Sequence, residues 1–489
     1  MDRRELLTLA VTGRKQAGRR RDPAPSPHQK ISAGLEPYRP TTQQPWNRRR
    51  AAHLLRRARL GPPRRSEIDR FMKLGPAEAV AELFRFPPSP VLPAWADEPV
   101  ELPLDFEAEY RMRQELVTWW LRQAYVDGSI RERLVFFWSN HFVVEMEKVF
   151  VARLILSINR LFRDAAAGDI RDLTKRVGQN PAMLIYLDGN LNTKYGINEN
   201  YARELLELFT MGRSHYTQTD VTEAARALTG WRINPTLLGA YRHPLLHDNG
   251  QKTFLGHTGN WNDEDIVDII FGQRATAVFL AGRIYRHFVS PVADEDLVQA
   301  LADRLIASDF ELEPVLKDLL GSAHFMADEL IGSDIKSPID FLLGVLRQFH
   351  ATKIDWPFMG LILSVLGQTP FDPPNVAGWP GHRDWLSTSS LPFRQMLAQA
   401  VIYPSRLFIM DYHRFLHQLP HPEDPRQLVR HVTTDFLPLA LDEQTEAELV
   451  AILLGSLPPN QWNPYRPEAM TRVRLFLQAV MQMAEYQLH

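Results

Sequence analysis

Five polar side chains that could perform chemistry lie close together on one predicted helix. At 100° per residue, Glu199, Asn200, Arg203, Glu204 and Glu207 fall on the same side of that helix, and Asn198 immediately precedes them. An arginine binds carboxylates and phosphates through two parallel hydrogen bonds, and a glutamate can act as a general base. We therefore take Arg203 and Glu204 as candidate catalytic residues, and Asn198, Asn200 and Glu207 as candidate ligand-binding residues.

A row of solvent-exposed salt bridges along the helix would account for the same charged residues without any catalytic role. Arg203 lies four residues after Glu199 and four residues before Glu207. Pairs at this spacing stabilise a helix by only about 0.3 kcal/mol each. Both interpretations stay open at this stage.

A helical hairpin must position these groups. The opposite face of the first helix is apolar, and its residues are Ala202, Leu205, Leu206 and Phe209. Gly212 stands where a residue of left-handed conformation would end that helix. A second amphipathic helix over residues 220–228 ends before Gly230.

Three further residues outside the hairpin are candidates for the same site. His141 is the third candidate catalytic residue, and Asp248 and Lys252 are candidate ligand-binding residues. His141 and Glu145 are four residues apart, so they could bind a divalent transition metal together with Glu204. The complete metal-binding signatures are absent from the sequence, so the identity of any metal stays unknown.

Several short sequence motifs, or blocks, occur along the chain in an order that is itself informative about the protein family. The central block is Asn-Glu-Asn-Tyr-Ala-Arg-Glu-Leu at 198–205, and the others lie at 52–57, 137–142, 208–212, 247–252, 336–338 and 373–385. Together they resemble a large bacterial family known only as domain of unknown function number eighteen hundred. The resemblance extends from about Trp46 to the end of the sequence.

The resemblance implies a mostly helical protein, but it supplies no chemistry. Members of this family often carry an export signal. They are commonly encoded beside an exported, sulfatase-like protein, which is therefore the partner that the resemblance implies.

Composition narrows the possible functions. Of the 489 residues, 45% are hydrophobic and 23% are charged, as in ordinary globular proteins. The formal net charge of -2 predicts no attraction to nucleic acid, and no apolar run approaches the roughly 18 residues of a transmembrane helix. The absence of cysteine excludes disulfides, thiolate catalysis and iron–sulfur clusters.

The first 45 residues predict a disordered basic arm. Residues 1–50 hold 12 lysines and arginines against 4 aspartates and glutamates, with prolines and no periodicity. Arg3 and Arg4 resemble a twin-arginine export signal, but Thr8 interrupts the short apolar stretch that follows. The compartment stays open between the cytoplasm and, through a degenerate twin-arginine signal, the periplasm.

Residues 46–489 predict a single large helical domain. Apolar residues recur at helical spacing along most of this range. Asn249-Gly250 between two alternating runs, over residues 245–255, predicts one small inserted β-hairpin. The expected fold class is therefore all-α with a small β-hairpin.

Two functional classes follow. The first is a binding or assembly protein that acts with the sulfatase-like partner. The second is a helical hydrolase, possibly metal-dependent, with its site around Asn198 to Glu207. We favour the binding class because no complete catalytic or metal signature is present.

Overall fold

The computed structural model describes residues 34–236, 238–402 and 409–489. The twin-arginine motif and most of the predicted basic arm lie outside the described residues. Residues 34–45 follow an irregular path in which Tyr38 N donates a hydrogen bond to Gly321 O (2.8 Å) and Ala323 N donates to Glu36 O (2.8 Å). The predicted disorder therefore does not extend to these residues.

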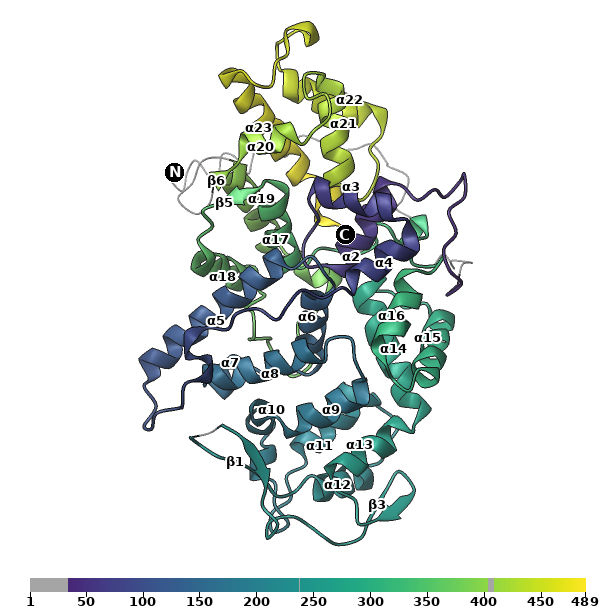
Figure 1. The fold of residues 1–489 in the computed structure, drawn as a ribbon, viewed down its shortest axis with the longest axis vertical. Helices are drawn as coiled ribbons and strands as arrows, with labels where there is room; N and C mark the ends of the chain where they lie inside the picture. The colour runs from purple at the N-terminus through teal and green to yellow at the C-terminus, as the bar shows by residue number, and fades with distance from the viewer. Residues whose placement is uncertain (1–33, 237, 403–408) are drawn as a thin grey trace.

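The described chain is mainly helical, as predicted (Figure 1). The helices of its first half are α2 (Arg48–Ala58), α3 (Arg65–Leu74), α4 (Pro76–Leu83), α5 (Phe106–Val126), α6 (Arg131–His141), α7 (Met146–Val149), α8 (Ala152–Asp164), α9 (Ile170–Gln179), α10 (Pro181–Tyr186), α11 (Asn200–Glu204) and α12 (Gln218–Ala227). Those of the second half are α13 (Asp263–Phe271), α14 (Arg274–Phe288), α15 (Glu295–Ala307), α16 (Leu312–Leu320), α17 (Pro338–Gln348), α18 (Trp356–Val365), α19 (Ser390–Ile402), α20 (Tyr412–His417), α21 (Pro425–Phe436), α22 (Glu443–Leu454) and α23 (Pro467–Gln482).

Three small antiparallel sheets of two strands each accompany the helices. They pair β1 (Trp231–Ile233) with β2 (Ala240–Arg242), β3 (Lys252–Phe254) with β4 (His257–Gly259), and β5 (Ala351–Thr352) with β6 (Ile409–Met410).

The predicted β-hairpin forms close to its expected place, but its turn was predicted wrongly. The turn between β3 and β4 is Leu255-Gly256, where both residues have positive φ. The Asn249-Gly250 pair precedes β3, because the Asp248 carboxylate accepts a hydrogen bond from Gly250 N (2.8 Å) and closes a local turn there.

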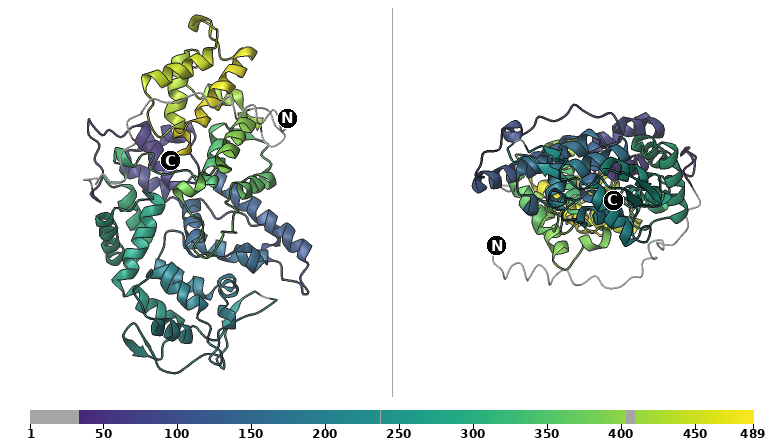
Figure 2. Two further views of the ribbon diagram at one scale, coloured as in Figure 1. Left: turned by 180° about the vertical axis from the view of Figure 1, so that it is seen from behind. Right: turned by 90° about the horizontal axis from the view of Figure 1, so that it is seen from below.

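The molecule is elongated, and its two ends come from different parts of the chain. Helices α20–α23 form one end, and α11–α13 with the β3 hairpin form the other (Figures 1 and 2). Residue 489 lies between these ends beside α2, where His489 N donates a hydrogen bond to Asp334 O (2.8 Å).

Helix α17 lies near the centre of the molecule, and every one of its residues is buried. Its sequence is apolar nearly all round, as expected of a helix covered on all sides. A β-carbon on Gly344 would lie 2.2 Å from Pro62 Cδ, so glycine allows the segment after α2 to pass against α17. This close approach brings the end of α2 beside the start of α17.

Helix α2 is unusual because it buries four arginines with its apolar residues: Arg50, Arg56, Arg57 and, at its end, Arg59. Buried charges require partners. Arg59 pairs with Glu67 (2.8 Å), whereas Arg56 donates to the main-chain oxygen of Asp435 (2.8 Å). Burial lowers the pKa of Arg56 to about 10.

The predicted helical hairpin is present, with one irregularity. Leu205–Thr210 form a π-helix that continues α11, and Met211 N donates to Leu206 O. The four residues of the predicted apolar face are buried, and Gly212 ends the segment with a φ of 73°.

Candidate functional site

The charged residues of the helical hairpin bind to one another. Arg203 pairs with Glu199 (3.0 Å) and also donates to Gln218 (3.0 Å), and its side chain is 40% exposed. Glu207 accepts from Arg213 (2.6 Å) and from the Tyr216 hydroxyl (3.2 Å). The Arg203–Glu199 pair is one of the two that a row of salt bridges along the helix predicts, whereas Glu207 pairs with Arg213 instead of Arg203.

The side chains of Asn198 and Asn200 are held by local hydrogen bonds. Asn198 Oδ1 accepts from Asn200 N (2.9 Å), and the Asn200 amide donates to Asp188 (3.3 Å). Glu204 is half-buried, and its pKa is raised by burial and by repulsion from Glu207.

His141 is fully buried, and its ring packs against aromatic side chains. Its Nε2 lies 2.9 Å from Phe209 O, at the end of the π-helix, and its ring contacts four phenylalanines: Phe137, Phe142, Phe209 and Phe279. Burial, with a smaller effect of Arg283, lowers its pKa to about 3, so the imidazole is neutral at neutral pH. The structure therefore does not bring His141 together with the exposed face of the hairpin.

Asp248 and Lys252 stabilise the loop before β3. Asp248 pairs with Arg226 (2.8 Å), and the Lys252 ammonium donates to Asp248 O (2.6 Å) and Gly250 O (3.0 Å). Within the described ranges, no three histidine, aspartate or glutamate side chains are grouped so that they could hold a metal ion.

A cavity of about 450 Å³ lies elsewhere, where α2, α6, α14 and α17 meet the loop that contains Trp379 and Trp385. Four arginines, three histidines and two aspartates line it, together with aromatic and small residues. The charged and polar lining residues are Arg57, Arg133, Asn140, Arg283, Arg286, His287, Asp334, Ser337, Asp340, Gln368, His382 and His489.

Two of these arginines are neutralised by the aspartates. Arg57 pairs with Asp334 (2.8 Å), and Arg133 pairs with Asp340 (2.8 Å). These arginines hold the pKa of both carboxyl groups below its usual range, although burial acts in the opposite direction. Both pairs therefore remain ionised at neutral pH.

The other two arginines lie one turn apart on α14. Arg283 is partly buried and donates to the main-chain oxygen of Asn140 (3.2 Å), whereas Arg286 is exposed. Neither has a carboxylate within salt-bridge distance among the residues that the structure describes. Burial, and then the charge of Arg286, lower the pKa of Arg283.

The loop from Pro373 to Trp385 closes one side of the cavity. Trp379 stacks on Phe136 with 5.6 Å between ring centroids, and its main-chain N donates to Asn140 Oδ1 (2.8 Å). Gly378 has a φ of 88°, and a β-carbon there would lie 2.3 Å from the same Asn140 oxygen. Only glycine fits this approach without displacing the amide.

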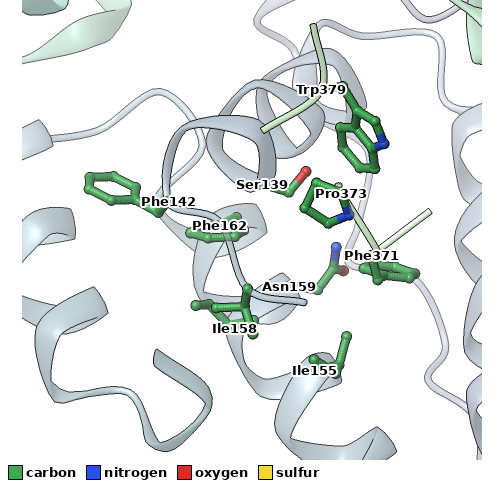
Figure 3. A pocket seen from close by; sticks show the side chains of 10 residues that line it. Ser139, Phe142, Ile155, Ile158, Asn159, Phe162, Phe371, Pro373 and Trp379 are labelled. Atoms are coloured by element: carbon green, nitrogen blue, oxygen red, sulfur yellow. The ribbon is translucent and has the colours of Figure 1, made fainter. Parts of the chain in front are cut away.

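Trp379 also separates the large cavity from a much smaller one. Figure 3 shows this second cavity, of about 20 Å³, between Phe371, Pro373 and Trp379 on one side and α8 on the other. It is large enough for about one water molecule, and its lining is mainly apolar. It is therefore too small to hold a ligand beyond a single water molecule.

Comparison with protein families matched residues 53–488 to a family described as "Protein of unknown function (DUF1800)". The chain belongs to this family. Comparisons with curated proteins and with solved structures found no match. In the described ranges, no helix of the DUF1800 chain combines the length and apolar character that crossing a bilayer requires.

Four of the sequence blocks that resemble DUF1800 reach the large cavity. The block at 52–57 supplies Arg57, the block at 137–142 supplies Asn140, and the block at 336–338 supplies Ser337. The last block supplies Trp379 and Trp385. The hairpin block does not line this cavity.

Sequence reasoning did not identify the other charged residues and the histidines that line the cavity. They are Arg133, Arg283, Arg286, His287, Asp334, Asp340, His382 and His489. One signal was available for Arg283 and Arg286, because α14 contains no acidic residue that could neutralise its arginines. The others are brought to the cavity by folding alone.

Proposed function

We propose that this DUF1800 chain is a binding protein that takes a small anionic ligand in the large cavity. The observation that carries the proposal is Arg283, a partly buried arginine that lines the cavity without a carboxylate partner in the described ranges. Four guanidinium groups face only two aspartates there. An anion would provide the missing negative charge.

The physical basis is the cost of burying a charge. An arginine withdrawn from water loses hydration, and the lowered pKa of Arg283 reflects that loss. A bound carboxylate, phosphate or sulfate would offset it through charge-assisted hydrogen bonds, and guanidinium geometry suits all three anions. Arg286 would add a second positive charge at the opening.

The proposed function is still binding, which is the class that the sequence favours. The proposed site, however, lies in the large cavity and not on the helical hairpin. Assembly with an exported sulfatase-like protein remains part of the proposal, with family resemblance as its support. A hydrolase site around Asn198 to Glu207 has less support, because Arg203 pairs with Glu199 and Glu207 pairs with Arg213.

Isothermal titration calorimetry with phosphate, sulfate, succinate and malate tests the proposal. We expect at least one anion to bind, and Arg283→Gln with Arg286→Gln to weaken that binding at least tenfold, or about 1.4 kcal/mol. Arg274→Gln is the matched control, because Arg274 lies on the same helix but is exposed and paired with Asp303 (2.6 Å). Wild-type protein that binds none of the anions, or a double variant that binds them unchanged, would contradict the proposal.

A further inference from the structure

His382 stands out among the cavity residues because a carboxylate orients one side of its ring. His382 Nδ1 lies 3.1 Å from Asp334 Oδ1, and Arg57 and Ile335 N also bind this carboxylate (2.8 Å each). Asp334 is ionised, since its pKa is held below the usual range. An ionised carboxylate only accepts hydrogen bonds, so the proton of His382 lies on Nδ1.

The other ring nitrogen is consequently available as an acceptor. In neutral imidazole, a proton on Nδ1 leaves a lone pair on Nε2. Nε2 has no hydrogen-bond partner in the part of the chain that the structure describes, and the His382 side chain is 28% exposed while lining the cavity.

The backbone at His382 supports a specific role for this side chain. Its φ of 54° lies in the left-handed region, which is disfavoured for a residue other than glycine. The loop adopts this conformation while the contact with Asp334 orients the ring. This wall of the cavity therefore presents an oriented acceptor.

We propose that the ligand is an oxyanion that also carries a hydroxyl group, with the anion bound by Arg283 and Arg286 and the hydroxyl donating to His382 Nε2. The inference rests on the proposed anion site and adds the ligand class. Hydroxycarboxylates and phosphate esters of polyols share this chemistry. His382 is then the specificity-determining residue, and it distinguishes a hydroxylated anion from its deoxy analogue.

Calorimetry with ligand pairs that differ by one hydroxyl tests this inference at mildly alkaline pH. The pairs are malate with succinate, and glycerol 3-phosphate with propyl phosphate, so that the two pairs also distinguish a carboxylate from a phosphate. We expect the hydroxylated member of at least one pair to bind at least tenfold more tightly to the wild-type protein. In His382→Asn, which tolerates positive φ and keeps a donor for Asp334, this preference disappears.

His421→Asn is the matched control. His421 also has a positive φ of 47° and pairs through Nδ1 with a carboxylate, Glu423 (3.3 Å), but it lies outside the cavity lining. We expect this variant to keep the preference for the hydroxyl.

The outcomes separate the inference from the proposed function. If anions bind through Arg283 but both members of each pair bind equally, the inference is wrong and the anion site stands. If His382→Asn weakens both members of a pair equally, His382 only holds the loop, and the inference is again overturned. If no anion binds, the proposed function fails and the inference fails with it.

Discussion

At Arg203, the two interpretations of the sequence predict different results. Its guanidinium is 40% exposed and pairs with Glu199, so we expect Arg203→Ala to lower the free energy of unfolding by only about 0.3 kcal/mol. Anion binding should be unchanged. Urea denaturation and calorimetry measure the two effects. A folded variant that loses an activity would instead support the catalytic prediction for Arg203 and Glu204.

The sequence could indicate single polar residues but not their partners. The hairpin candidates were found because their spacing places them on one helix face, which is local information. Asp334 and His382 are separated by 48 positions, and Arg133 and Asp340 by 207. No local spacing reports such pairs, because only the packing of distant elements creates them.

At the scale of elements, the loop from Pro373 to Trp385 depends on its contact with α6. We expect Gly378→Ala to weaken anion binding, because the new methyl group would displace Asn140 and release Trp379 N. Gly196→Ala is the control, since a β-carbon there meets no atom within 4 Å and Gly196 lies outside the cavity lining. Calorimetry of both variants measures the effect. Equal affinities would show that the loop does not shape the site.

The sequence predicted whole elements better than their irregular parts. The helices follow from apolar residues at helical spacing, and Leu205 and Leu206 are buried as expected. The turn of the β3 hairpin was misplaced because Asp248 competes for the Asn249-Gly250 segment through a side-chain hydrogen bond. The π-helix was missed because a helical period does not report one additional residue in a turn.

At the scale of the whole molecule, buried neutral histidines make stability depend on pH. The pKa is lowered to about 3 for His141 and to about 4 for His489, and it is far below the ordinary value for His53 and His287. Burial is the main cause in each case. As pH falls from about 6.5 towards 4, the unfolded chain binds more protons than the folded one, so the free energy of unfolding decreases.

Urea denaturation at about pH 7.5, 6 and 5 measures this loss of stability. For each such histidine, the free energy of unfolding falls by up to about 1.4 kcal/mol per pH unit within this window. We expect His141→Phe to reduce the slope of stability against pH. The lowered pKa values of Asp334 and Asp340 affect stability only below about pH 5, where those carboxylates begin to be protonated in the unfolded chain. Stability that is constant from about pH 7.5 to 5 would contradict the prediction.

The position of residues 486–489 beside α2 and α17 has a consequence for biosynthesis. The wall of the large cavity combines Arg57, from near the start of the described chain, with His489. Lys336 N likewise donates to Gln487 O (2.8 Å). A nascent chain therefore cannot complete the cavity while residues 486–489 are still inside the ribosome, and contacts of such long sequence separation form late and slowly. On the proposed function, ligand binding would begin only after these residues have emerged and docked.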